Sequence, residues 1–273
     1  MPTLPSELER EIFEIAIRDN HNNAAWKLNF SLVARRVQYW IDLVYYEVVT
    51  IKTPVQAHKF LELVDWKPHD FFALAVKSLC IAYSISAVDA SRILSVCSNV
   101  QQLACWVPWE KSPNLTQLLN SLCRLNQLSI ETGHFLSILR SQSTPFPGLT
   151  HLELKWWLSS PRTSLDLGAL PNLTHVSLSR AGRSEAESVC LTCASLQVLV
   201  IQKLAPEEEY AFDARIVMAP SDITYGEPVE VWEDVAFRRP ENMWAYAENV
   251  VLSRKQKLDG RWYVLRLTYN AQS

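Results

Sequence analysis

The sequence has few glycines, the residues on which phosphate-binding loops depend. Only 6 glycines occur among 273 residues, and no two of them lie within four positions of each other. This spacing excludes glycine-rich phosphate loops and dinucleotide-binding fingerprints in their usual form. The hydrolase patterns G-x-S-x-G and H-E-x-x-H are absent as well. We therefore expect a protein that is not an enzyme and that needs no cofactor.

The sequence also lacks a large net charge and a long apolar run. The 26 basic and 29 acidic residues leave a net charge of -3, which gives no positive field to attract a phosphate backbone, so nucleic acid is not an expected partner. No apolar stretch is long enough to cross a bilayer, and the N-terminus becomes charged too early for a signal peptide. We expect a cytoplasmic or nuclear protein without a membrane partner.

Cysteine is scarce too, and its spacing does not favour a metal site. In a reducing compartment the 6 cysteines are better interpreted as small apolar residues than as disulfides. Cys190 and Cys193 form a single C-x-x-C, but a zinc site needs further ligands, and the nearest histidine, His175, lies 15 residues upstream. The sequence therefore predicts no metal site.

What the sequence does contain is an internal repeat of about 24 residues. The pattern apolar-x-x-apolar-x-apolar occurs six times, with successive spacings of 24, 25, 24, 24 and 23 residues. The six triplets are Val76/Leu79/Ile81, Val100/Leu103/Cys105, Leu125/Leu128/Ile130, Leu149/Leu152/Leu154, Leu173/Val176/Leu178 and Leu196/Leu199/Ile201. The last two positions of each triplet are two residues apart and so share one face of a short strand. One such strand cannot bury its apolar side alone, whereas six stacked strands form a parallel sheet with a continuous core.

The segments between these strands differ in character. Residues 88–96 and 115–122 carry apolar residues at helical spacing, which predicts helices there. Residues 155–170 and 179–192 contain Gly, Ser, Pro or Arg, which favours irregular structure. The period and the triplets over 76–204 resemble leucine-rich repeats. This resemblance implies an α/β fold, a short solenoid with a curved parallel sheet.

The N-terminal region, 1–52, is expected to be a small helical unit. Ser6 and Glu9 have the spacing of a capping box, and the apolar residues that follow predict a helix from about 6 to 18. A second amphipathic stretch runs from Leu32 to Val44. Thr53 followed by Pro54 then predicts the start of a linker helix within 53–75.

The motif Leu4-Pro5-Ser6-Glu7-Leu8, with Ile12, the segment 31–36 and Trp40, resembles an F-box. An F-box before leucine-rich repeats is the arrangement of substrate receptors in cullin-RING ubiquitin ligases, and the whole chain resembles the short F-box-like repeat proteins of higher fungi. The resemblance implies docking to the Skp-type adaptor of the ligase and binding of an unknown protein substrate for ubiquitin-dependent degradation. The implied adaptor-binding residues are Leu4, Pro5, Leu8, Ile12, Leu32 and Val33. Two alternatives stay open: an N-terminal unit that only caps the repeats, and a repeat scaffold without any ligase.

If the triplets face inward, alternation along each strand sends their neighbours to the concave surface. The expected substrate-binding residues on that surface are Gln102, Trp106, Gln127, Glu131, His151, Glu153, Lys155 and His175. The recurrence of histidine at 151 and 175 is what repeat copying alone produces. A third alternative, a hydrolase that uses these histidines, lacks the nucleophile and the third partner that a catalytic site requires.

The last region, 205–273, is expected to cap the C-terminal end of the repeats. Residues 213–218 predict one more strand, and Pro240 opens a predicted helix that carries Trp244.

Overall fold

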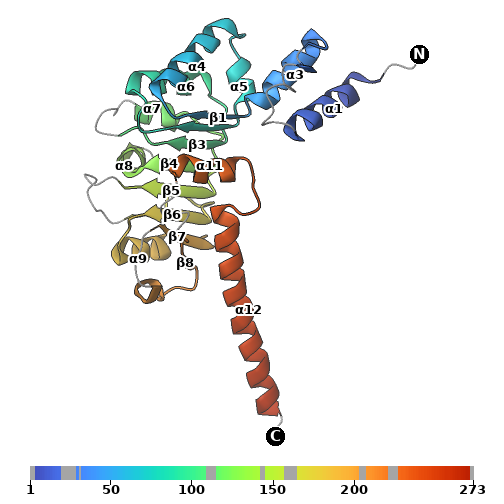
Figure 1. Cartoon of the computed structure of the whole chain (residues 1–273). Coiled ribbons are helices and arrows are strands. Elements are labelled where there is room, and N and C mark those ends of the chain that lie inside the picture. Colours follow the sequence, from blue (N-terminus) through green and yellow to red (C-terminus); the bar gives the residue numbers. More distant parts are fainter. Residues whose placement is uncertain are drawn as a thin grey trace.

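The computed structural model describes residues 4–19, 29–30, 32–108, 115–141, 145–156, 165–202, 207–220 and 227–270. Within these ranges the chain is an α/β protein built on one open, all-parallel sheet whose strands follow one another in chain order (Figure 1). The strands are β1 (Val48–Ile51), β2 (Ser78–Ile81), β3 (Gln102–Cys105), β4 (Gln127–Glu131), β5 (His151–Lys155), β6 (His175–Ser179), β7 (Val198–Gln202) and β8 (Ile216–Met218). The predicted α/β class and parallel sheet are therefore confirmed.

A ladder of aliphatic side chains crosses this sheet in register. The rungs are Leu79, Leu103, Leu128, Leu152, Val176 and Leu199, each paired with the next. All six side chains are fully buried in one continuous core. The predicted stacking of the triplets as neighbours in a parallel sheet is thus confirmed.

Two strands extend the six that the triplets predict. The strand β8 joins β7 in parallel, as the sequence suggested for 213–218. The strand β1 pairs with β2, although residues 1–52 were expected to form a wholly helical unit. That expectation was wrong for residues 48–51 because three of these four residues, Val48, Val49 and Ile51, have β-branched apolar side chains, which favour strands.

Six helices cover the side of the sheet on which the triplets lie. They are α4 (Pro54–Trp66), α5 (Phe71–Ala75), α6 (Ala87–Val96), α7 (Leu115–Asn120), α8 (Thr132–Ser141) and α9 (Arg183–Thr192). The predicted helices at 88–96 and 115–122 correspond to α6 and α7. The predicted cap of the linker helix is also present, since the Thr53 side chain accepts a hydrogen bond from the Gln56 amide as α4 begins.

Helix α9 lies in a segment that was expected to be irregular. Its N-terminus is capped because the Gly182 amide donates to the Glu185 carboxylate at 2.9 Å. Ala186 and Val189 then pack into the core. The polar residues near 182 therefore mark a helix start, and the prediction of irregular structure was wrong for 183–192. The other irregular segment, 155–170, lies partly outside the described residues.

The two C-terminal helices, α11 (Pro228–Ala236) and α12 (Met243–Asn270), pack on the opposite side of the sheet. The first packs Val229, Trp232 and Ala236 against outward residues of β2 and β3. The first turns of α12 pack against outward valines of β7 and β8, and its ribbon then extends away beyond β8 (Figure 1). A helix carrying Trp244 is therefore present. Its first turns lie on the face of the sheet at β7 and β8, whereas the sequence predicted a cap at the end of the repeats.

The N-terminal helices α1 (Ser6–Asp19) and α3 (Arg35–Tyr45) form a pair beside the sheet (Figure 1). Their mutual contact is a small hydrophobic cluster, centred on Ile17, Val37 and Ile41, that is separate from the main core. The carboxylate of Glu9 accepts hydrogen bonds from the Arg36 guanidinium at 3.0 and 2.8 Å, which ties the two helices together. Among the described helices, none combines the length and apolar character that crossing a membrane requires.

Candidate functional site

The outer side of α1 is apolar and exposed. Leu8 and Ile12 leave 48% and 56% of their surface open to solvent, and Ile15 extends the same stripe along the helix. The inner side of α1 uses Phe13 and Ile17 to pack on α3. Exposed apolar patches of this kind mark sites of protein interaction, since isolated soluble helices normally turn such residues inward.

The turn before α3 also exposes apolar side chains. Leu32 is 76% exposed and Val33 is 58% exposed, and Leu4 and Pro5 at the start of α1 are exposed as well. All six residues that the F-box resemblance implies for adaptor binding are thus at the surface. We call Leu4, Pro5, Leu8, Ile12, Leu32 and Val33 the N-terminal apolar patch.

The second predicted surface lies on the face of the sheet under α11 and α12, which we call the strap face. Four of the predicted substrate-binding residues form a row across neighbouring strands: Gln102 pairs with Gln127, Gln127 with His151, and His151 with His175. This row is not open, because four of the eight predicted substrate-binding residues are buried: Trp106, Glu131, Glu153 and His175. The other four, Gln102, Gln127, His151 and Lys155, are partly exposed.

Glu153 is the centre of a hydrogen-bond network within the strap face. Its carboxylate lies 2.6 Å from the Lys155 ammonium and accepts bonds from Ser129 and from Gln202. The Trp106 indole extends the network by donating to Ser129 at 2.8 Å. Burial would raise the pKa of Glu153, but Lys155 and the hydrogen bonds outweigh burial and lower it. The expectation that Glu153 and Trp106 form an open contact surface is corrected, since both are occupied inside the protein.

Glu131 also has an internal partner. Its carboxylate accepts a hydrogen bond from the His134 amide at 3.2 Å, which caps the N-terminus of α8. The Glu131 carboxylate lies at the N-terminus of α8, where the helix dipole favours a negative group. Its prediction as a substrate-binding residue is corrected for the same reason.

A small cavity lies between α11, the start of α12 and the strap face. Gln127, Glu153, Trp232 and Trp244 are among the residues around a cavity of about 10 Å³, which is room for about one water molecule. A partner peptide cannot enter there while α11 and α12 stay in place.

His151 and His175 lie next to each other on β5 and β6, as the repeat predicted. Their rings stack with centroids 4.3 Å apart, and the Trp244 ring meets both of them edge-on. Glu248, one turn further along α12, brings a carboxylate oxygen to 3.1 Å from His175 Nε2. Sequence reasoning missed Glu248, because it lies outside the predicted strand pattern, and Gln202, although it follows the sixth triplet at the position that Lys155 has after the fourth.

All six cysteines are free thiols. Burial raises the pKa of Cys97 and Cys105 to about 12. In the C-x-x-C pair, burial raises the pKa of Cys190 to about 12 as well, and Cys193 donates a hydrogen bond to the Leu173 carbonyl. Thiols held protonated in this way are poor nucleophiles and poor metal ligands, which agrees with their interpretation as small apolar residues.

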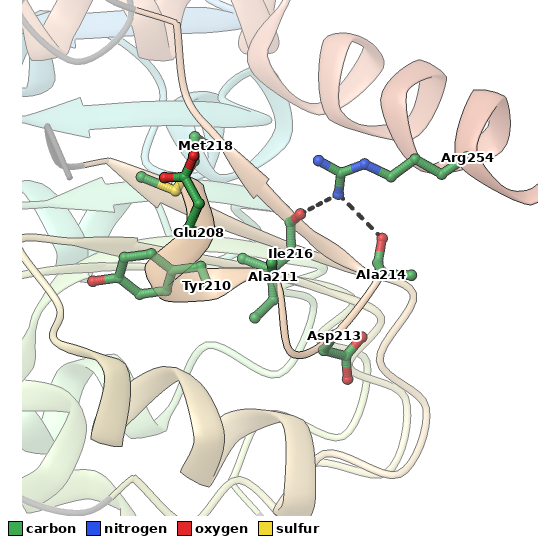
Figure 2. Close-up of a pocket in the computed structure, with 8 residues that line it drawn as sticks. All are labelled: Glu208, Tyr210, Ala211, Asp213, Ala214, Ile216, Met218 and Arg254. Atoms are coloured by element: carbon green, nitrogen blue, oxygen red, sulfur yellow. Dashed lines mark hydrogen bonds between the residues drawn. The ribbon is translucent and has the colours of Figure 1, made fainter. Parts of the chain in front are cut away.

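A pocket of about 390 Å³ lies at the β8 end of the sheet, where Figure 2 shows Arg254 reaching from α12 over the loop before β8. The Arg254 guanidinium donates to the main-chain carbonyls of Ala214 and Ile216. The Ile216 carbonyl belongs to β8, the last strand of the described sheet, and the Ala214 carbonyl lies in the loop before it, so Arg254 satisfies acceptors that this edge would otherwise present to other chains.

Replacing Arg254 with alanine should therefore lower the free energy of unfolding by about 1.5 kcal/mol, the scale of charged hydrogen bonds. The freed edge of β8 should also promote self-association. Denaturant unfolding and sedimentation velocity measure the two effects, and Arg254→Lys should lose less stability because it keeps a charged donor. Unchanged stability and a monomer at all concentrations would contradict this role.

No protein-family model matches the chain, and no curated protein matches its sequence.

Proposed function

We propose that this chain is a protein-binding adaptor without enzymatic activity, the substrate-recognition subunit of a cullin-RING ubiquitin ligase. In this proposal the F-box-like helical pair docks to a Skp-type adaptor, and the leucine-rich-repeat part of the chain binds a protein substrate. The rate of ubiquitin transfer then rises because the substrate is held near the catalytic subunits, which carry out all the chemistry.

The observation that carries the proposal is the exposure of the N-terminal apolar patch. Leu8 and Ile12 are exposed to solvent on one face of α1, although burying each such side chain stabilises a protein by about 1.5–3 kcal/mol. A partner with an apolar groove would recover this free energy, in the way that helix-in-groove interfaces use anchors at i and i+4.

The same observation disfavours a helical unit that serves only as a cap for the sheet. A cap needs its apolar side against the end of the sheet, whereas the patch faces solvent and the helix pair has its own small core around Val37. The helix pair contacts the rest of the protein mainly through α3 and α5, where the Tyr39 and Phe71 rings lie 6.2 Å apart and Lys67 pairs with Asp42.

On the substrate side, the buried members of the predicted row no longer support direct contact. Gln102, Gln127, His151 and Lys155 stay in the proposal as partly exposed positions. Substrate contact through the rest of the strap face would require the two helices to leave the sheet.

The test is co-purification of the chain with the Skp-type adaptor. Leu8→Asp should weaken adaptor binding by on the order of 100-fold, because an unpaired carboxylate in an apolar interface costs several kcal/mol. Leu191→Asp is the matched control, since Leu191 is also a leucine on a helix and is 85% exposed; it should bind as the unmodified chain does.

Failure of the unmodified chain to bind the adaptor would refute the ligase proposal. Binding that survives Leu8→Asp would show that the N-terminal apolar patch is not the docking surface. If removal of residues 1–52 leaves the cellular partners unchanged, the chain is a repeat scaffold without ligase coupling.

A further inference from the structure

Three side chains with metal-binding groups meet on the strap face from distant parts of the chain. They are His151 on β5, His175 on β6 and Glu248 on α12, and one ligand atom from each lies within 4.8 Å of the others. His175 is buried, His151 is partly buried and Glu248 is 56% exposed at its side chain. The cluster therefore has a protein-covered base and an accessible mouth.

The Nδ1 atom of each ring faces a threonine hydroxyl. The hydroxyl of Thr150 donates to the Asn126 carbonyl at 3.0 Å, and its oxygen lies 2.9 Å from His151 Nδ1. The hydroxyl of Thr174 likewise donates to the Thr150 carbonyl at 3.2 Å and lies 2.8 Å from His175 Nδ1. When each hydroxyl gives its one proton to the carbonyl, each Nδ1 donates to its threonine. The Nε2 atom of both rings then carries a lone pair.

The lone pair on His175 Nε2 matters because Glu248 lies beside it. Its Oε1 atom lies 3.1 Å from His175 Nε2, yet no hydrogen bond of proper geometry satisfies this buried nitrogen. A carboxylate oxygen and an imidazole lone pair are both acceptors and repel each other at this distance unless a cation lies between or beside them. The cation is either a proton on His175 or a metal ion.

Protonation of the histidine pair is opposed by its surroundings. Burial, with the neighbouring His175, lowers the pKa of His151 to about 4. Burial also lowers the pKa of His175, although Glu248 works in the opposite direction. Neutral imidazoles and an ionised carboxylate are the states in which these groups bind metals.

We propose that His151, His175 and Glu248 form a binding site for a divalent transition-metal ion of the zinc class. The donor set of two imidazole nitrogens and one carboxylate oxygen matches open zinc sites, in which water takes the fourth position. Thr150 and Thr174 act as the outer partners that fix the ring tautomers, a role that carbonyls, carboxylates and waters fill at many metal-bound histidines. This inference does not depend on the proposed ligase function.

Binding requires a modest rearrangement within the cluster. Two nitrogens on one tetrahedral zinc ion lie about 3.3 Å apart, given zinc–nitrogen distances of about 2.0–2.1 Å. The rings are stacked with an angle of 8° between their planes, so they must tilt toward a common point. Glu248 is exposed and can adjust its side chain without moving the backbone.

The bound ion would fasten α12 to the sheet. Trp244 and Glu248 are one turn apart on α12, and both contact the histidine pair. A ligand that binds only this arrangement stabilises it in proportion to its concentration over its dissociation constant. Metal occupancy would thus set how firmly α12 covers β5 and β6.

The test uses the full chain after removal of metals by chelation. Zinc chloride in competition with a chromogenic chelator should show one equivalent bound with a micromolar or lower Kd and a raised Tm. Cobalt(II) should give visible absorption of four-coordinate ions without thiolate charge-transfer bands, which distinguishes this site from Cys190 and Cys193. Glu248→Gln should weaken binding at least 10-fold. This variant is the decisive test, because an exposed position tolerates the substitution. His175→Ala should abolish binding.

His58→Ala is the control, because His58 and Glu62 form an exposed histidine–carboxylate pair at 3.2 Å and should leave the affinity unchanged. Absence of stoichiometric binding would overturn the proposal. Affinity retained in Glu248→Gln, or lost in Cys190→Ser, would overturn it too, because the ion would then be held elsewhere.

Discussion

Replacing Leu152 with alanine is expected to lower the free energy of unfolding by about 3 kcal/mol, within the range of about 2–5 kcal/mol for leucine to alanine in a core. Leu152 is fully buried and pairs in register with Leu128 on one side and Val176 on the other. Truncation leaves a cavity in the middle of the strand ladder, where neighbours fixed by main-chain pairing cannot move in to fill it. Denaturant unfolding measures the loss.

Leu191→Ala is the matched control for this substitution. The same atoms are removed from a helix, but Leu191 is 85% exposed, so the change should stay within about 0.5 kcal/mol. Equal effects of the two substitutions would contradict the central place of Leu152 in the core.

The strand ladder could be predicted because its buried positions repeat with two periods at once. Within each triplet the last two apolar residues are two apart, as in Leu152 and Leu154, and the triplets recur at the spacing of one strand and one return connection. Register follows from the same spacing, since a shift by one residue would turn every buried side chain outward. The pairing of His151 with His175 was predictable for this reason.

The helices over the strap face could not be predicted from this pattern. A period of two indicates that one face is buried, but it does not identify what covers the other face. A signal was nevertheless present in β7, where Val198, Leu199, Val200 and Ile201 are apolar at every position and buried on both faces. Such continuous apolar strands are typical of sheets covered on both sides.

Some features of the candidate sites could likewise be predicted from the sequence, and others could not. The exposure of the N-terminal apolar patch could not be deduced from helical spacing, because α1 carries apolar residues on its inner side at Phe13 and on its outer side at Ile12. The pairing of Ser129 with Glu153 follows from the register, but the register does not show that the Gln202 side chain reaches across β6 to Glu153. Only the neighbours within one strand, such as Glu153 and Lys155, follow from local alternation.

Replacing Lys155 with methionine should lower the free energy of unfolding by about 3 kcal/mol at pH 7. The Lys155 ammonium lies 2.6 Å from the Glu153 carboxylate, and the side chains are only 15% and 10% exposed. Removing one partner of a buried ion pair leaves the other charge uncompensated, at a cost of about 3–5 kcal/mol. Lys52→Met is the control, because Lys52 and Glu233 are 3.7 Å apart and more exposed, so its loss should cost less than about 1 kcal/mol.

The pH dependence distinguishes this ion pair from a packing effect. The pKa of Glu153 is lowered in the folded protein because Lys155 and the hydrogen bonds outweigh burial. Its contribution is therefore present above the unfolded pKa of about 4.3 and is lost as the pH falls through the lower, folded value. In Lys155→Met, burial dominates and raises the pKa of Glu153 above its unfolded value of about 4.3, so protonation relieves the variant as the pH falls through that raised value. The stability difference between the two proteins should be largest at pH 7 and narrow in acid, whereas a difference that is constant with pH would assign the loss to the packing of the lysine stem alone.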